Sequence, residues 1–126
     1  MKVEKKYLEV FYLALKDSKL KLADARVRDR FLKPLTEALE SFYKERTAIY
    51  ENFCFKTEDG KPDIKDNKYQ FDPLKVDEIN VELKALHDEE VDLPSDEKVK
   101  GILENTDYEP KAGETEIIDI LIAKFK

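Results

Sequence analysis

Residues 21–55 read KLADARVRDRFLKPLTEALESFYKERTAIYENFCF, and this stretch decides the fold that the sequence predicts. Apolar residues recur along it at intervals of three, four or seven, which is the period of an α-helix rather than the period of two of a strand. They are Val27, Phe31, Leu35, Ala38, Phe42, Ile49 and Phe53. On one side the stripe widens to include Leu32, Leu39, Tyr43 and Tyr50. A stripe of this breadth is typical of a helix packed on a globular core, so we expect one long helix with its apolar face covered.

Pro34 lies inside this predicted helix. A proline there removes one backbone hydrogen bond and clashes with the preceding turn, at a cost of about 3 kcal/mol. The chain can therefore form one kinked helix, or two helices with Pro34 in the first turn of the second. The apolar stripe keeps its phase across Pro34, which favours a single helix kinked near residues 30–33.

Helical spacing predicts shorter helices on both sides of the long one. The first covers residues 3–17, although a strand at Met1–Val3 remains open. The second covers residues 74–90 and should run antiparallel along the long helix, with its apolar stripe buried. The members of that stripe are Val76, Ile79, Leu83 and Leu86.

Two further elements are predicted near the C-terminus. A helix over residues 96–105 follows Ser95, Asp96 and Glu97, which form a favourable N-terminal signature. Residues 114–126 fit both a helix and an edge strand, since their isoleucines suit either. We favour the helix because no confident strand partner exists elsewhere in the sequence.

A long loop, residues 56–72, and an acidic connector, residues 88–97, separate these helices. Asp59–Gly60 predicts a turn within the loop, and the loose alternation of Ile64, Tyr69 and Phe71 is compatible with a short hairpin. We therefore expect a single, mainly helical (all-α) domain over residues 1–126. Its long kinked central helix packs antiparallel against a second helix, with short flanking helices and one long loop.

The composition points to a protein outside membranes and in a reducing compartment. The chain has 126 residues, of which 41% are hydrophobic and 41% are charged. No apolar run approaches 18 residues, so we expect no membrane span. The N-terminus lacks the apolar segment of a secretion signal, and the single Cys54 cannot form an internal disulfide. These features favour a cytoplasmic location.

The sequence shows no pattern that predicts catalysis, a metal site or a cofactor. Its three glycines, at positions 60, 101 and 113, cannot build a phosphate-binding loop. His87 has no second histidine or cysteine nearby, so we interpret it as a surface or capping residue. The loop acids Asp59, Asp63 and Asp66 do not match a calcium-binding loop. We expect a non-enzymatic protein, although abundant carboxylates leave an unrecognised acid pair open.

Charge is unevenly distributed and marks two candidate interaction sites. Residues 1–33 hold ten Lys or Arg against five Asp or Glu, whereas residues 34–126 hold thirteen against twenty-four. The basic candidate set, suited to nucleic acid, is Lys16, Lys19, Lys21, Arg26, Arg28, Arg30 and Lys33. The acidic candidate set, suited to a protein partner, is Asp88, Glu89, Glu90, Asp92, Asp96 and Glu97. For both sets, charges that merely solvate a helix or a connector are the simpler interpretation.

Three segments together resemble a family of small proteins of unknown function in phages and prophages of Gram-positive bacteria. The first is KLADARVRDRFLKPL at residues 21–35. The second is the Glu-rich helix leading into an aromatic segment and the DGKP…KYQF loop, residues 37–71. The third is a helix ending in DEEVDL at residues 88–93, with an acidic tail that closes on IIDILIAKF at residues 117–125. The resemblance implies a phage or prophage protein in the bacterial cytoplasm, with a helical hairpin and no assigned catalytic residues.

Two functions are therefore expected from the sequence. The first is a phage accessory protein that binds another protein of phage or host, either in assembly or as an inhibitor of a host defence system. The acidic connector would then act as a phosphate-like surface. The alternative is a nucleic-acid-binding protein that uses the basic N-terminal third. A homodimer is a further possibility, because a long amphipathic helix in a small chain often pairs with a second copy of itself.

Overall fold

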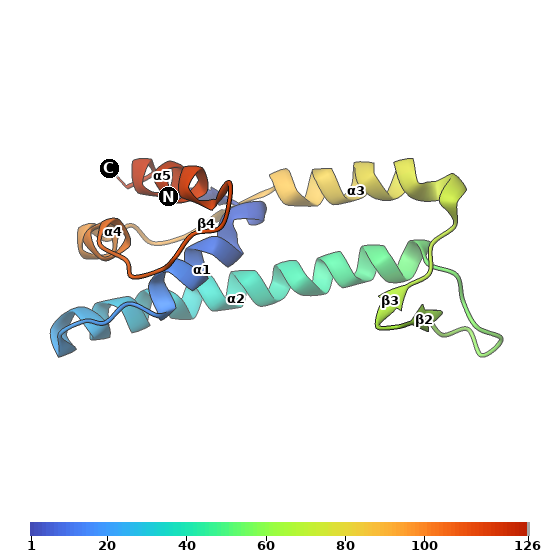
Figure 1. Cartoon of the computed structure of the whole chain (residues 1–126), viewed down its shortest axis with the longest axis horizontal. Coiled ribbons are helices and arrows are strands. Elements are labelled where there is room, and N and C mark those ends of the chain that lie inside the picture. Colours follow the sequence, from blue (N-terminus) through green and yellow to red (C-terminus); the bar gives the residue numbers. More distant parts are fainter. Residues whose placement is uncertain (126) are drawn as a thin grey trace.

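The computed structural model describes residues 1–125, and the chain is mainly helical, as the sequence predicts (Figure 1). Its helices are α1 (Leu8–Lys16), α2 (Leu22–Phe53), α3 (Val76–Asp88), α4 (Glu97–Glu104) and α5 (Glu114–Ala123). Two short 3-10 helices, η1 (Lys5–Tyr7) and η2 (Pro73–Lys75), precede α1 and α3. Two small antiparallel sheets pair β1 (Lys2–Glu4) with β4 (Glu90–Asp92), and β2 (Ile64–Lys65) with β3 (Lys68–Tyr69).

The long helix α2 has 32 residues and continues through Pro34. The expectation of one helix rather than two is therefore confirmed. Phe31 and Leu35, which lie one turn apart on either side of Pro34, are 4% and 0% exposed. Their burial stabilises the helix across the position where proline removes a backbone hydrogen bond. Of the predicted stripe, Val27, Phe31, Leu35 and Phe42 are buried, while Ala38, Ile49 and Phe53 are half-buried.

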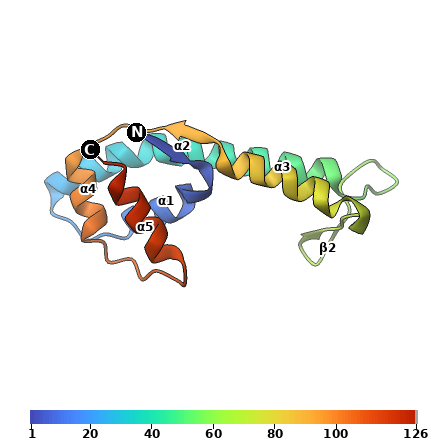
Figure 2. The same cartoon turned by 90° about the horizontal axis from the view of Figure 1, so that it is seen from above.

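We call the part of the molecule outside residues 40–88 the head. There, α1 and α4 lie against the first half of α2, and α5 lies against α1 and α4 (Figures 1 and 2). Three aromatic rings meet in its core: the Phe11 centroid lies 5.3 Å from Phe31 and 6.2 Å from Phe125. The remaining core of the head is aliphatic, with Leu8, Leu15, Val99, Leu103 and Leu121 at most 1% exposed.

We call residues 40–88 the arm. Its two helices, the second half of α2 and the antiparallel α3, lie side by side and project from the head (Figures 1 and 2). The predicted antiparallel packing of these helices is confirmed. Only Ile79 and Leu86 of α3 are buried, so this helix contributes one narrow stripe to the interior. The other faces of α3 remain open to solvent.

The predicted loop of residues 56–72 carries a short hairpin at the end of the arm. Asp66 and Asn67 connect β2 to β3 with φ angles of 53° and 62°. Two successive positive φ angles define the type I′ turn, which asparagine and aspartate tolerate better than most residues. Gly60 has a φ of 78°, in agreement with the predicted turn at Asp59–Gly60. The rings of Tyr50, Tyr69 and Phe71 lie within 5.8–6.2 Å of one another and anchor the hairpin on α2.

The predicted first helix is wrong for its opening residues. Residues 2–4 form strand β1, which matches the open alternative of an initial strand, and the α-helix begins only at Leu8. The cause is pairing with a distant segment, with Lys2 opposite Asp92 and Glu4 opposite Glu90. The amide N–H of Leu93 donates to the carbonyl oxygen of Met1 at 2.8 Å and extends this ladder.

The same pairing corrects the predicted connector at residues 88–97. Residues 90–92 are a strand, and the helix predicted to reach residue 90 ends at Asp88. Asp96 caps α4 by accepting a hydrogen bond from the Lys98 amide at 2.9 Å, so this helix starts one residue later than predicted. Residues 114–123 form helix α5, and the strand alternative is wrong. Lys126, the last residue of that predicted segment, lies outside the described residues.

Candidate interaction surfaces

The six acidic residues of the predicted partner site do not form one free patch. Asp88 accepts a hydrogen bond from Lys6 at 3.0 Å and forms an ion pair with Lys84 at 3.7 Å. Glu89 binds Lys5, and Asp96 caps α4. Three of the six acids therefore stabilise the fold. The other three are exposed and have no ion-pair partner among residues 1–125; they are Glu90, Asp92 and Glu97.

Asp88 lies at the C-terminal end of α3, where the helix dipole disfavours a negative charge. The hydrogen bond from Lys6, with a further contribution from Lys84, offsets this and lowers the pKa of Asp88 below its usual value. Burial alone would lower the pKa of Lys5, but hydrogen bonds and charge attraction from Glu89 and Glu45 raise it above its usual value. Both lysines come from the N-terminal segment and hold the base of the arm against the head.

The predicted basic set divides into residues with and without partners. The Arg28 guanidinium donates to the carbonyl oxygen of Ser18 at 2.6 Å and to Asp29 at 3.1 Å, so it fixes the start of α2. Lys16 lies over the Tyr12 ring, 5.7 Å from its centroid, and Lys19 is exposed in the connection before α2. The other four are exposed and have no acidic partner within residues 1–125; they are Lys21, Arg26, Arg30 and Lys33.

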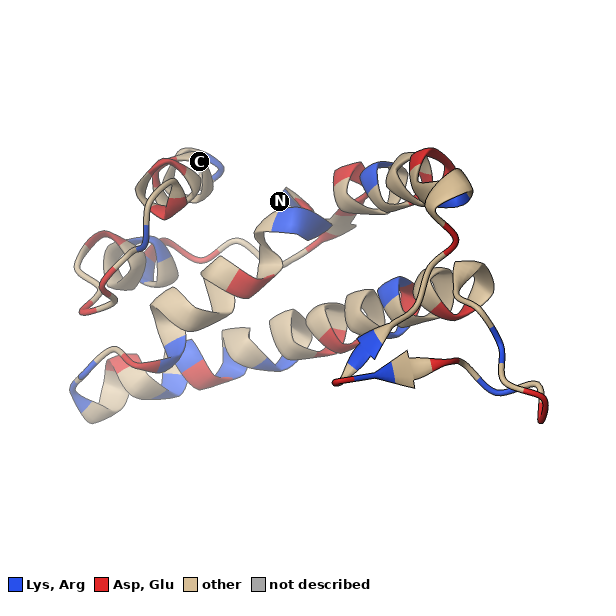
Figure 3. Ribbon diagram, turned by 45° about the vertical axis from the view of Figure 1, so that its right-hand side comes forward, with Lys and Arg blue, Asp and Glu red and all other residues tan. Residues whose placement is uncertain are grey.

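These four cations lie at the start of α2, where Lys and Arg positions recur along the ribbon (Figure 3). Arg26, Arg30 and Lys33 are spaced four and three residues apart and so share one helix face. Leu22 precedes Arg26 by one turn and is 66% exposed. We call Lys21, Leu22, Arg26, Arg30 and Lys33 the basic face; it combines four unpaired cations with one exposed leucine.

A third surface, on the arm, was not predicted from the sequence. The large exposed hydrophobic side chains of the arm are Phe55 (47%), Ile64 (52%), Leu74 (91%), Val76 (43%) and Val81 (67%). Within residues 1–125 the head contributes only Leu22 to this class. Val76 was predicted to be buried, and this is wrong because the helix begins at Val76 and turns it beyond the contact with α2. A second stripe at Leu74, Val81 and Ala85, spaced seven and four, is the signal that the sequence already contained.

Acidic residues surround the apolar side chains on α3. A shallow hollow of about 420 Å³ is lined by Phe53, Asp77, Glu78, Val81 and Glu82. None of its three acids has a basic partner within ion-pair distance in the described part of the chain. Leu74 lies in η2, seven residues before Val81, and is 91% exposed. We call Leu74, Asp77, Glu78, Val81 and Glu82 the arm face.

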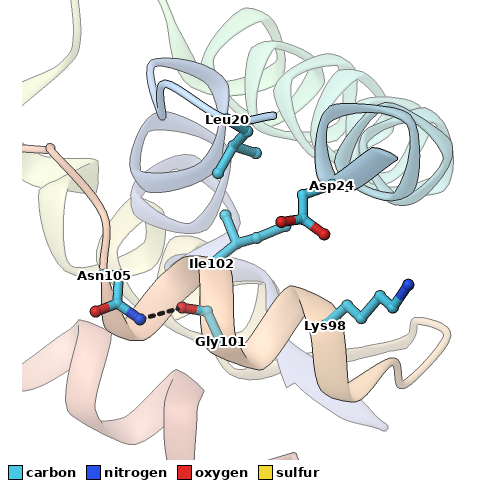
Figure 4. A pocket seen from close by; sticks show the side chains of 6 residues that line it. All are labelled: Leu20, Asp24, Lys98, Gly101, Ile102 and Asn105. Carbon is cyan, nitrogen blue, oxygen red and sulfur yellow. Dashed lines mark hydrogen bonds between the residues drawn. The ribbon is translucent and has the colours of Figure 1, made fainter. Parts of the chain in front are cut away.

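A separate hollow of about 360 Å³ lies in the head between the start of α2 and α4 (Figure 4). Asp24 and Lys98 supply charged groups at its rim, and Ile102 supplies an apolar wall. The Asn105 side-chain amide donates to the carbonyl oxygen of Gly101 at 2.8 Å and completes the last turn of α4. None of the residues lining this hollow is a serine, threonine, cysteine or histidine, so the lining offers polar contacts without a hydroxyl or thiol nucleophile.

His87 packs against an aromatic ring, and neither it nor the loop acids belong to a metal-binding cluster among residues 1–125. The His87 ring lies 5.7 Å from the Phe42 ring centroid and is half-buried between α3 and α2. Among residues 1–125, no three His, Cys, Asp or Glu side chains gather where they could hold a metal ion. Across the same residues, no helix combines the length and the apolar character required to cross a membrane.

Comparisons of the chain with models of protein families, with curated proteins and with solved structures found no match. The proposals for function therefore rest on the fold and on three surfaces: the acidic connector, the basic face and the apolar surface of the arm.

Proposed function

We propose that this chain is a non-enzymatic protein of a phage or prophage that acts in the bacterial cytoplasm by binding another protein. The observation that carries this proposal is the exposed apolar surface of the arm. Five of the six large exposed hydrophobic side chains of residues 1–125 lie on residues 55–81, which project away from the head. Exposed apolar side chains gathered in one region and bordered by polar residues are typical of a protein-binding surface.

Leu74 and Val81 offer the most apolar surface for a partner to cover, because they are 91% and 67% exposed. Removing a leucine or valine side chain from water is favourable by about 1.5–3 kcal/mol, before the entropic cost of association is subtracted. The base of the arm is held by ion pairs from Lys5 and Lys6, so the arm presents these residues on a fixed support. A partner therefore meets a surface that is already in place, which lowers the entropic cost of binding.

The same geometry favours an assembly role over inhibition of a host defence protein by phosphate mimicry. Mimicry requires several unpaired acids next to one another on the connector. Asp88, Glu89 and Asp96 are instead occupied by Lys5, Lys6, Lys84 and the start of α4. We therefore place the protein contact on the arm and not on the acidic connector.

Site-specific photo-cross-linking tests this proposal. One variant carries a photo-reactive amino acid at Val81, and the control carries it at Ala112, an exposed head residue. Each purified variant is irradiated alone and in nuclease-treated lysate of the native host. We expect a discrete protein adduct from position 81 and none from position 112. The absence of any adduct from position 81 would contradict the proposal.

Nucleic-acid binding is the second candidate function, and the four unpaired cations of the basic face favour it. A phosphate backbone would meet Lys21, Arg26, Arg30 and Lys33, and its affinity would fall steeply with salt because counterions are released. Fluorescence anisotropy with labelled DNA and RNA at low salt measures this directly. Binding that is lost in Arg26→Gln/Arg30→Gln supports the candidate; no binding by the wild type eliminates it.

A further inference from the structure

We propose that the partner of the arm face is the basic face of a second copy of this chain, so that copies associate head to arm. This inference rests on the proposed function, because it names the partner of the same arm surface. Each of the two faces presents an exposed apolar group together with unpaired charges, which are negative on the arm face and positive on the basic face. The oppositely charged Lys84 and Asp29 also lie on these helix faces, but each is already in an ion pair, with Asp88 and Arg28 respectively. The arm face has Leu74 and Val81 with three acids, and the basic face has Leu22 with four cations.

The charges of the two faces are complementary and are available for a contact. Asp77, Glu78 and Glu82 have no basic partner within residues 1–125, and the four cations of the basic face have no acidic partner there. Opposite charges at the rim of a contact accelerate association and select the partner, while the apolar centre supplies most of the affinity. Leu22 would lie over Leu74 and Val81 in such a contact.

The two faces cannot meet within one molecule. Leu22 begins α2, whereas Phe53, which lines the hollow of the arm face, ends it. A helix of 32 residues spans about 48 Å at 1.5 Å per residue. The first turn of α2 lies in the head and its last turn lies at the far end of the arm (Figures 1 and 2). Only a second copy, therefore, can bring the two faces together.

A two-fold contact between two arm faces is disfavoured by the same charges. It would place Asp77, Glu78 and Glu82 of one copy against the same three acids of the other, and like charges across a contact cost free energy. A head-to-arm contact joins two different surfaces and leaves one of each unoccupied at the ends. Such a heterologous contact produces open chains or closed rings rather than a simple dimer.

Sedimentation velocity on two complementary variants tests this arrangement. The arm variant is Leu74→Asp/Val81→Asp, and the head variant is Arg26→Glu/Arg30→Glu. All four positions are exposed, so both variants should keep the helical circular dichroism of the wild type. The control, Ala112→Asp/Thr115→Asp, adds the same two charges as the arm variant at exposed positions of the head.

At low salt and high concentration, we expect the wild type and the control to form species larger than a monomer. Each variant alone should sediment as a monomer. An equal mixture of the two should give a species of twice the monomer mass, because the intact basic face of one variant binds the intact arm face of the other. Added salt should dissociate all of these species.

Three results would overturn the inference. They are a monomeric wild type at every concentration, a head variant that still associates by itself, and a mixture that remains monomeric. A monomeric wild type whose position 81 still cross-links to another protein would remove the self-association and leave the proposed function intact. A monomeric wild type without any adduct from position 81 would remove both.

Discussion

The ammonium group of Lys5 lies 2.6 Å from a carboxylate oxygen of Glu89, although 84 positions separate these residues in the sequence. The same ammonium group lies 3.0 Å from Glu45 on α2. The Lys5 side chain is only 11% exposed, and a buried charge is tolerated when it is paired and hydrogen-bonded. This contact joins the N-terminal segment to α2 and to the residue that directly follows α3, and fixes where the arm leaves the head.

Replacing Lys5 by methionine should therefore destabilise the fold. The substitution keeps the length of the apolar chain but removes hydrogen bonds to two carboxylates. Bonds to charged groups typically contribute about 1.5–3 kcal/mol. Because Glu45 and Glu89 are 43% and 54% exposed and recover hydration, we expect a loss of about 1–2 kcal/mol in the free energy of unfolding. Urea denaturation measures this loss.

Lys84→Met provides the matched control, since the Lys84 side chain is 79% exposed. Its effect should stay within about 0.5 kcal/mol, as for most surface substitutions. Equal losses for both variants would show that the contact of Lys5 with Glu45 and Glu89 adds no stability beyond that of an ordinary surface lysine.

Two glycines should respond to alanine with opposite signs. Gly113 precedes α5 with a φ of 86°, a conformation that side chains other than glycine rarely adopt, whereas Gly101 lies inside α4. A Cβ atom at either position would meet no neighbour within 4 Å, so backbone conformation decides the outcome. Gly113→Ala should lower stability by about 1 kcal/mol and Gly101→Ala should raise it by about 0.5–1 kcal/mol. Thermal unfolding of the two variants measures these changes as shifts in Tm. Shifts of the same sign would contradict the backbone conformations assigned to the two glycines.

Phe125 should be essential to the core of the head. It is 3% exposed, and its ring lies 6.2 Å from Phe11 and 6.5 Å from Phe31. Phe125→Ala should lower the free energy of unfolding by about 3–5 kcal/mol, because the cavity cannot close fully. Phe55→Ala removes the same atoms from a residue that is 47% exposed and should cost less than about 1 kcal/mol. Similar losses for the two would show that Phe125, which follows α5, is not docked in the core as described.

Because of the Tyr108–Glu114 contact, part of the stability should be lost at acidic pH. The backbone N–H of Lys111 and then the Tyr108 hydroxyl donate to Glu114, which lowers the pKa of that carboxyl below its ordinary 4.5. A lowered pKa gives a stabilisation that is present above pH 4.5 and is lost as the pH falls through the folded value. Tyr108→Phe should raise the pKa of Glu114 towards 4.5 and remove part of this stabilisation. A carbon-13 NMR titration of the Glu114 carboxyl checks the direction, and an unchanged pKa would refute the contact.

The helices could be predicted from the sequence because their signals are local. The spacing of Val27, Phe31 and Leu35 continues across Pro34, and the single long helix follows from it. The start of α4 was predicted within one residue from the capping residues around Asp96. The helical prediction for residues 114–126 was correct over α5, and no strand of the described structure pairs with that segment.

The β1–β4 pairing could not be predicted, because each strand has three residues and its partner lies nearly ninety positions away. Nothing local in KVE or EVD identifies the other segment. For the same reason the roles of Asp88 and Glu89 were missed: both appeared to belong to an open acidic connector, and only the fold places Lys5 and Lys6 beside them.

The arm face was missed for a different reason. Residues 76–86 were assigned one apolar stripe, and that stripe accounts for the buried Ile79 and Leu86. The second stripe, with Leu74 and Val81, became recognisable only when the structure showed that α3 packs against α2 and η1 and leaves these two side chains exposed.

The head-to-arm contact is the central claim, and zero-length cross-linking of carboxylates to amines tests it most directly. An equal mixture of unlabelled and nitrogen-15-labelled protein would be cross-linked and analysed by mass spectrometry, so that adducts between copies carry mixed labels. We predict mixed-label links from Asp77, Glu78 or Glu82 to Lys21 or Lys33. Mixed-label links that are absent, or that join other positions only, would contradict the contact.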